Sequence, residues 1–451
     1  MSDLFFPKEQ LFAPSKEASK VHILAQRFEG KCSIDAISTL MKRSEIPFSS
    51  VGFISQFLSR VGQLLPNTLE NKSEAVQFVV FVGDEIFAKD IPLLITVDPI
   101  SSAILRIELA TKRTEVIWSK HLHAIQDNGF QARLFATDGG VALRAAHQKT
   151  LGDIPWQLDT FHGISYRLGH CVRQFEKSAY AAIEAADKRE DKVASAKSNR
   201  VIEKRLKLYF KAENFSDQAI DLYDHFHYLY TILIHELNVF DSQANLRQRE
   251  QVESTMKVVF ELMESLNHKT INKKIASIRN ALPNMLTYFD DASVAVENCQ
   301  KLSSNQDALD ALYLAWQWNK AVIKSKVTAR KHRAIEQRQS YLELAALCME
   351  DEEKYIELKA SVYAELDQII QASSMVECIN SILRPYLNNS KNQVTQEFLN
   401  TFMFYHNHRR YHAGKRKGKT PMEILTGIKQ TEDWITLLLE SIEEQEHFLA
   451  A

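Results

Sequence analysis

Residues 78–87 read Phe-Val-Val-Phe-Val-Gly-Asp-Glu-Ile-Phe, and the segment around this stretch decides the fold. Aromatic and β-branched residues dominate it, which predicts a strand over 76–87. Two further β-rich runs follow at 92–98 and 103–109, separated only by short turns. Strands joined by short turns pair antiparallel, so the sequence predicts a three-stranded meander.

Helical and strand-like patterns alternate after the meander. We expect a helix over 114–128, a strand over 132–138, a helix over 141–149 and a short strand over 155–158, followed by a long helix. Three antiparallel strands followed by helix, strand, helix, strand and helix is the order of an α/β ribonuclease H-like core. The last helix of that core would lie at 373–384, far downstream in the chain.

A long segment without helix breakers separates the two parts of this core. No glycine occurs between Gly169 and Gly414, and only Pro283 and Pro385 interrupt the segment. Apolar residues recur at helical spacing within it, for example over 254–266 and 308–335, so we expect an all-helical insertion. Trp316 and Trp318 lie in this insertion, where core packing is favoured over stacking on a flipped base, because the two rings face different sides of a helix.

The N-terminal segment predicts a helix-turn-helix. Helices are expected over 15–28, over 34–42 with Ser33 as its cap, and over 51–65. Gln56 and Arg60 on the third helix are candidate DNA contacts, and a small helical bundle without DNA contact is the alternative. The predicted domains are 1–72 (helix-turn-helix, DNA-binding), 73–169 (first part of the core), 170–370 (helical insertion), 371–427 (end of the core) and 428–451 (C-terminal helix).

Three carboxylates are the candidate catalytic residues. Asp84 lies in the first strand, Asp138 ends the fourth strand before Gly139-Gly140, and Glu377 lies on the helix predicted at 373–384. Two strand-borne Asp and one helix-borne Glu can hold two divalent metals for phosphoryl transfer. Asp98 is the rival of Asp84, but placing it on the first strand leaves too few strands, and Asp98-Pro99 is typical of a turn.

Several other side chains are candidate contacts to DNA. On the predicted Glu377 helix, Asn380, Ser381 and Arg384 share a face with the carboxylate, and Arg384 pairs well with phosphate. Pro385 is expected to end that helix. His162 follows the fifth strand and is a candidate catalytic residue that could touch the scissile phosphate or donate a proton, or it could be a partly buried imidazole.

A basic segment with interleaved aromatic residues follows at 402–426. Its cations predict a phosphate-binding surface, and they are Arg409, Arg410, Lys415, Arg416, Lys417 and Lys419. His406, His408 and His412 are interpreted as part of a DNA-facing polar strip rather than as metal ligands. Thr420-Pro-Met-Glu423 predicts a capping box with proline at the first helical position.

The composition restricts the possible classes of protein. The formal net charge is −2, with 45% hydrophobic and 25% charged residues, so DNA binding would depend on local patches. The five cysteines are scattered without a Cys-x-x-Cys pair, which argues against zinc and disulfides and suits a reducing cytoplasm. No apolar run approaches the roughly 18 residues of a membrane span. The N-terminus lacks the pattern of a signal peptide.

The chain resembles a DDE-type insertion-sequence transposase of the Mutator-like and integrase-like superfamily. The resemblance is strongest over 371–427, where SSMVECINSILRPYLNN and YHNHRRYHAGKRKGKTPMEIL are similar to the Glu helix and the Lys-Thr-Pro helix of such enzymes. GDEIF and ATDGG resemble the two Asp motifs, and DTFH resembles the His motif of the Mutator-like group.

By this resemblance Asp84, Asp138 and Glu377 would hold two Mg²⁺ ions, which Mn²⁺ can replace. The expected partners are double-stranded DNA and a second copy of the chain, in a homodimer or a higher oligomer, with no membrane. We expect the protein to be in the prokaryotic cytoplasm, associated with the nucleoid. A catalytically inactive DNA-binding regulator derived from a transposase is the alternative function, and a helical scaffold protein or a simple nuclease are further ones.

Overall fold

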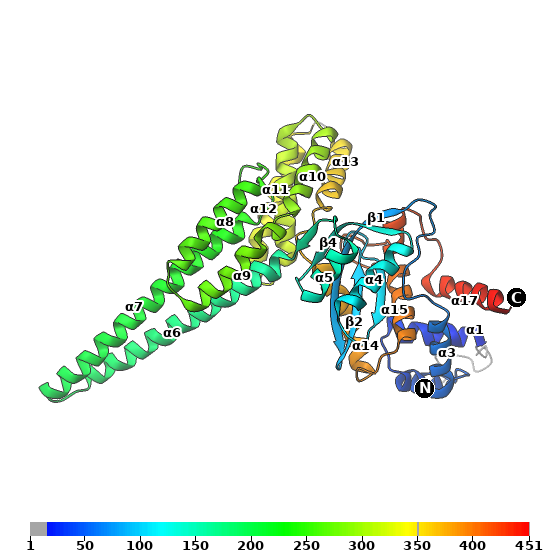
Figure 1. The fold of residues 1–451 in the computed structure, drawn as a ribbon, viewed down its shortest axis with the longest axis horizontal. Helices are drawn as coiled ribbons and strands as arrows, with labels where there is room; N and C mark the ends of the chain where they lie inside the picture. Colours follow the sequence, from blue (N-terminus) through cyan, green and yellow to red (C-terminus); the bar gives the residue numbers. More distant parts are fainter. Residues whose placement is uncertain (1–15, 350, 451) are drawn as a thin grey trace, which may run out of the picture. The chain divides into compact units, whose positions relative to one another are not determined.

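The structure is a computed structural model that describes residues 16–349 and 351–450, shown in Figure 1. Two compact units divide the chain. The first contains residues 1–156 and 373–451, and the second contains residues 157–372. The predicted insertion at 170–370 therefore corresponds to a unit that begins 13 residues earlier. Ser15, at the start of the first predicted helix, lies outside the described residues.

Helices at the N-terminal end of the first unit follow the predicted pattern. They are α1 (Lys16–Leu24), the π-helix η1 (Ala25–Glu29), α2 (Ile34–Arg43) and α3 (Val51–Gln63). The Ser33 hydroxyl accepts the Ala36 N–H, which confirms the predicted cap of α2. A small core of Ile23, Ile37, Met41 and Ile54 holds these helices together.

These helices do not form a compact unit of their own. α3 packs against α15 (Gln396–His408) so closely that a Cβ on Gly62 would lie 2.1 Å from the Glu397 carbonyl oxygen. The Asn400 side chain of α15 also donates to the carbonyls of Gly62 and Leu65 at 2.9 and 2.8 Å. Gly62 therefore permits a close backbone contact between α3 and α15, and the domain boundary expected at residue 72 stays a prediction.

A five-stranded sheet forms the centre of the first unit. Its strands are β1 (Gln77–Ala88), β2 (Ile91–Val97), β3 (Ile104–Leu109), β4 (Phe130–Thr137) and β5 (Trp156–Leu158), in the order β3-β2-β1-β4-β5. β1 pairs antiparallel with β2, and β2 pairs antiparallel with β3, which confirms the predicted meander. β4 pairs parallel with β1 on the other side.

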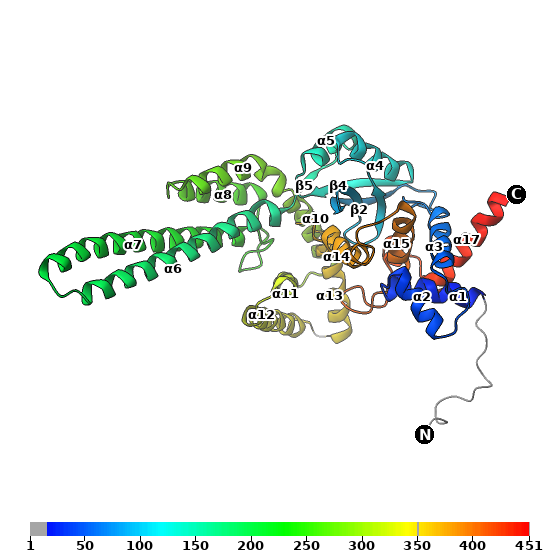
Figure 2. The ribbon, with the colours of Figure 1, turned by 90° about the horizontal axis from the view of Figure 1, so that it is seen from below.

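Helices cover both faces of this sheet. α4 (Glu115–Asp127) and α5 (Val141–Thr150) lie on one face, and α14 (Ser374–Asn389) and α15 lie on the other (Figure 2). Val79 and Phe81 of β1 pack with Trp118 and Leu122 of α4 in the main core. The chain is thus a mixed α/β protein. The side of α14 that carries polar side chains faces β1.

The sequence predicted that Pro385 ends the helix of Glu377, and this prediction is wrong. α14 continues to Asn389 because the turn after Pro385 is strongly held. Tyr386 is fully buried, its ring lies against Phe402, and its hydroxyl donates to the Phe28 carbonyl. These contacts outweigh the helix hydrogen bond that proline removes. Two further helices, α16 (Pro421–Thr426) and α17 (Trp434–Ala450), complete the unit.

The second unit is helical beyond the end of β5. Its helices are η2 (Phe161–Tyr166), α6 (Arg167–Ala194), α7 (Asn199–Glu236), α8 (Arg249–Glu264), α9 (Lys269–Met285), α10 (Tyr288–Leu302), α11 (Gln306–Lys324), α12 (Thr328–Leu347) and α13 (Glu352–Leu366). The helical run expected over 308–335 is interrupted between α11 and α12. Trp316 is buried and its indole N–H donates to Asp367 at 3.1 Å, so it is a packing residue as expected. Within the described part of the chain, no helix is both long and apolar enough to cross a membrane.

Candidate functional site

Asp84 lies in the middle of β1, on the face of the sheet that α14 covers. Side chains alternate between the two faces of a strand, so Val79 and Phe81 enter the core under α4 while Asp84 points to the opposite side. There the Nδ2 of Asn380, one turn along α14 from Glu377, donates to Asp84 Oδ2 at 2.9 Å. This hydrogen bond fixes the position of α14 relative to β1.

Asp138 lies beside Asp84 on the neighbouring strand. The parallel register of β1 and β4 pairs Phe81 with Phe135 and Val82 with Ala136. Continuing this register by two residues brings Asp138 level with Asp84 and on the same face. β4 ends at Thr137, Gly139 adopts a φ of +92°, and the Asp138 carboxylate accepts the Gly140 N–H at 3.0 Å.

Glu377 lies in the first turn of α14, exposed and three residues before Asn380. Residues three apart share one face of a helix, so the Asn380–Asp84 hydrogen bond brings the Glu377 side of the helix toward the two Asp. The negative charges of both Asp138 and Glu377 act on Asp84. The structure therefore gathers three carboxylates that the sequence had distributed over 294 positions.

The pKa of Asp84 reflects the proximity of the other carboxylates. Its pKa is raised to about 7, first by burial and then by the nearby charge of Asp138, with smaller contributions from Glu85 and Glu377. The backbone N–H of Glu85 acts in the opposite direction. Repulsion between carboxylates is unfavourable without a counter-charge, and such raised pKa values concentrate at functional sites.

The three carboxylates suit a hard divalent cation. Carboxylate and amide oxygens are the ligands that Mg²⁺ prefers, and the Asn380 Oδ1 is a buried oxygen without a hydrogen-bond partner beside Asp84. A cation would relieve the repulsion that raises the Asp84 pKa. In residues 16–349 and 351–450, however, no three His, Cys, Asp or Glu side chains are arranged to hold a metal ion, and Asp138 is turned to its own loop.

Asp98, the rival candidate, has a structural environment. It is 3% exposed, and its Oδ2 accepts the backbone N–H of Ser101 at 2.7 Å and the Ser101 hydroxyl at 2.5 Å. The Ser102 N–H in turn donates to the Asp98 carbonyl at 2.8 Å. Asp98 therefore closes the turn between β2 and β3, as the Asp-Pro pair predicted.

His162 belongs to the second unit, at the start of η2. Its backbone N–H donates to Asp159 at 3.1 Å, and its ring lies edge-on to Phe161 and near Tyr166. The Asp-Thr-Phe-His motif thus begins a helix, with Asp159 capping it. A catalytic role for His162 stays a prediction.

The basic segment contains two kinds of residue that the sequence did not distinguish. Arg416 donates to the carbonyls of Pro99 and Ile100 at 2.7 and 2.8 Å, and Arg410 pairs with Glu423 at 3.0 Å. Arg409 lies over the rings of Tyr405 and Tyr411. The three lysines Lys415, Lys417 and Lys419 are exposed. The predicted capping box of Thr420 and Glu423 is present.

Of the three histidines expected in a DNA-facing strip, His406 and His408 are covered by other residues, whereas His412 is exposed. His406 is fully buried, its Nε2 lies 2.9 Å from the Ser102 carbonyl, and burial lowers its pKa to about 3. His408 lies 3.0 Å from the Gln430 side chain, and burial lowers its pKa also. Both rings face the interior because α15 presents this side to β3 and to the following loop.

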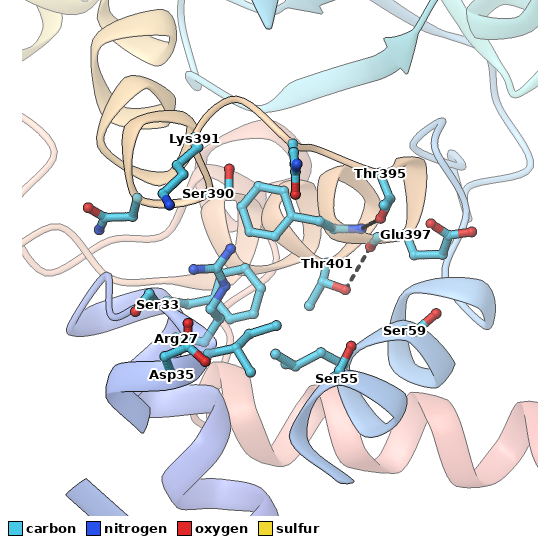
Figure 3. Close-up of a pocket in the computed structure, with 16 residues that line it drawn as sticks. Arg27, Ser33, Asp35, Ser55, Ser59, Ser390, Lys391, Thr395, Glu397 and Thr401 are labelled. Atoms are coloured by element: carbon cyan, nitrogen blue, oxygen red, sulfur yellow. Dashed lines mark hydrogen bonds between the residues drawn. The ribbon is translucent and has the colours of Figure 1, made fainter. Parts of the chain in front are cut away.

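A hydroxyl-lined cavity of about 470 Å³ lies elsewhere in the first unit, between the N-terminal helices and the start of α15 (Figure 3). Ser33, Ser55 and Ser59 contribute from α2 and α3, and Thr395 and Thr401 contribute from α15. Its basic residues, Arg27 and Lys391, are offset by Asp35 and Glu397. The candidate DNA contacts Gln56, Arg60 and Arg384 are exposed and do not line it.

The residue that sequence reasoning undervalued is Asn380. It was placed on the Glu377 face of its helix, but only the structure shows that it is 4% exposed and bonded to Asp84. Its spacing from Glu377 was the available signal. No family model matches the chain, and no curated protein matches it.

Proposed function

We propose that this protein is a DDE transposase, which cuts the ends of a DNA element and joins the freed 3′-hydroxyl to target DNA. The proposal depends above all on the grouping of Asp84, Asp138 and Glu377. Burial first, and then the charges of the other two carboxylates, raise the pKa of Asp84 to about 7. The strand order β3-β2-β1-β4-β5, with β2 antiparallel to its neighbours, is compatible with a ribonuclease H-like core. The helical second unit is compatible with an insertion before the Glu helix.

In this proposal Asp84, Asp138 and Glu377 hold two Mg²⁺ ions, or Mn²⁺ in their place. When bound, the ions would supply the charge that activates the attacking oxygen and steadies the leaving oxygen. Asn380 positions Asp84 by donating to Oδ2 of its carboxylate. The protein residues contribute mainly by positioning and electrostatic complementarity rather than covalent catalysis.

The partners in the proposal are double-stranded DNA and further copies of the chain. Arg384 is exposed on α14, Lys415, Lys417 and Lys419 are exposed in the basic segment, and Gln56 and Arg60 are exposed on α3. Arg410 and Arg416 are withdrawn from the proposed DNA surface, because they already bind protein groups. The expected location is the nucleoid of a prokaryotic cytoplasm.

The decisive experiment measures cleavage and strand transfer on labelled duplexes that carry the DNA flanking the gene, with Mg²⁺ or with a chelator. Asp84→Asn is compared with Asp98→Asn, because the two residues are rivals in sequence but differ in environment. Asp90→Asn, in the exposed turn after β1, is the matched control. We expect metal-dependent joining in the wild type and the Asp90 variant, and its loss in Asp84→Asn.

Each result distinguishes one alternative. Loss of joining only in Asp98→Asn would mean that the first ligand is misassigned, provided that this variant unfolds at the same urea concentration as the wild type. Cutting without joining would indicate a nuclease. Specific DNA binding without any cleavage by the wild type would replace the proposal with an inactive DNA-binding regulator.

A further inference from the structure

The longest helices of the second unit form a hairpin with an uncovered distal half. α6 and α7 run antiparallel, and their far ends extend beyond α8 and α9 (Figures 1 and 2). α7 has 38 residues, and its buried residues are Ser216, Phe226, Leu229 and Leu233, so none lies in its first 17 positions. A helix covered on only one side needs a further partner if its remaining surface is apolar.

The uncovered half of α7 does carry apolar side chains at regular spacing. Val201, Leu208 and Phe215 follow one another at seven-residue intervals and are 40, 43 and 64% exposed. Seven residues are close to two helical turns, so the three side chains form one stripe along the helix. The side chains of Ile202, Leu206 and Tyr209 lie on another side of α7 and are less exposed than the stripe. The stripe therefore lies beside the surface of α7 that contacts α6, not within that surface.

Charge is divided along the same helix. Residues 200–211 contain five basic side chains and one acidic side chain, whereas residues 212–224 contain four acidic side chains and no basic one. Because these two adjacent segments of α7 carry opposite charge, each is complementary to the other segment of an antiparallel copy. A double-stranded DNA partner would instead require basic residues along the whole surface, and the acidic half would repel it.

We infer that the distal half of α7 pairs antiparallel with α7 of a second copy, about a two-fold axis near Asn214. The stripe of Val201, Leu208 and Phe215 then lies in the seam between the two helices. Lys204 and Lys207 lie on the side of the seam that faces the partner's Asp221, and each pair occurs twice by symmetry. Lys207 also lies 3.5 Å from Glu203 in its own helix, but both side chains are about three-quarters exposed, so this contact is weak.

This pairing gives the homodimer of the proposed function a defined surface and rests on that proposal only for the presence of a dimer. It is therefore tested without DNA or metal, so that failure of pairing and failure of catalysis are measured separately. Sedimentation equilibrium of the full chain gives the dimer dissociation constant. Lys207→Glu and Asp221→Lys place like charges across the seam, and we expect each to weaken the dimer by about tenfold or more.

The charge-swapped double variant, Lys207→Glu with Asp221→Lys, restores the complementary pair and should recover the wild-type dissociation constant. Asp217→Lys is the matched control, because Asp217 lies on the same acidic half but outside the seam, and it should leave the dimer intact. Circular dichroism confirms that each variant keeps its helix content.

Three results would overturn the inference. The first is a wild-type chain that stays monomeric up to a protein concentration of 100 μM, roughly the weakest range for a specific pairing. The second is a double variant no tighter than the single variants. The third is that Lys207→Glu reduces DNA retention while self-association stays unchanged, which would assign the basic half of α7 to DNA.

Discussion

Replacing Asp84 with asparagine should stabilise the protein in the absence of divalent metal. The folded-state pKa of Asp84 is about 7, against an ordinary aspartate pKa of 3.8. A carboxyl with a raised pKa binds its proton more tightly in the folded state, so ionisation destabilises the fold as the pH rises from about 4 to 7. At about 1.36 kcal/mol per pKa unit, the full effect is on the order of 4 kcal/mol above pH 7.

Asparagine removes this effect because it keeps the shape of aspartate without its charge. At pH 5 the Asp84 carboxyl is largely ionised in the unfolded protein and protonated in the folded protein. Part of the stability difference between the wild type and Asp84→Asn is therefore already present at pH 5. We therefore expect the stability advantage of Asp84→Asn to grow by roughly 2–3 kcal/mol between pH 5 and pH 8. Buried His121 and His406 act in the opposite sense, since their lowered pKa values make stability increase as the pH rises toward 6.5. They are common to both proteins and cancel in the comparison.

Urea unfolding followed by hydrogen exchange in peptides from β1 and β4 measures this free energy for the first unit alone. All samples contain a chelator, and Asp90→Asn is the exposed control that should match the wild type at both pH values. Addition of Mg²⁺ should then stabilise the wild type more than Asp84→Asn, because binding to the folded state adds to its stability. The reasoning is refuted if Asp84→Asn is equally or less stable than the wild type at pH 8 in the chelator.

Three further variants test neighbouring features. Arg416→Ala should lower the free energy of unfolding by about 1–3 kcal/mol, since it leaves the carbonyls of the β2–β3 turn without their charged donor, whereas Lys417→Ala should change it by less than about 0.5 kcal/mol in urea denaturation. Thr420→Ala removes the capping box of α16 and should cost about 1 kcal/mol in the same assay. Asn380→Ala removes the hydrogen bond that favours the ionised form of Asp84, so the pH midpoint of metal-dependent cleavage should move upward, and an unchanged midpoint would contradict the positioning role of Asn380.

Local patterns predicted the strands and helix caps of the first unit well. The alternation of side chains across β1 and the Gly139-Gly140 pair after β4 are local features, and both bear directly on where Asp84 and Asp138 lie. Ser33 and Thr420 cap helices through their own neighbours, so their role also follows from a few consecutive residues. The parallel pairing of β1 with β4, which places the two Asp side by side, could be inferred only through the expected fold.

Long-range packing explains the predictions that were wrong. Pro385 lies inside α14 because Tyr386 is buried against residues 16 positions later and donates to Phe28, which no local rule describes. His406 was interpreted as facing DNA, but β3 and its preceding turn cover it. Gly62 allows α3 to touch the backbone of Glu397, which is another long-range contact that no local pattern indicated, and the domain boundary expected at residue 72 stays a prediction.

The distribution of charge connects these observations. A net charge of −2 suggests a chain with little affinity for polyanions, but that number averages over separated patches. Arg416 attaches the loop over 409–419 to the turn between β2 and β3, and Arg410 pairs with Glu423 of α16. The charge exposed in this loop comes mainly from lysines, whose single ammonium groups suit non-specific phosphate contacts. On α7 the five basic residues of 200–211 are followed by four acidic residues in 212–224, which favours pairing between copies over binding of DNA. Basic residues that look alike in the sequence therefore fall into three groups: those that bind other parts of the protein, candidate DNA contacts, and those of the α7 surface proposed to pair with a second copy. Only their surroundings in the fold distinguish these groups.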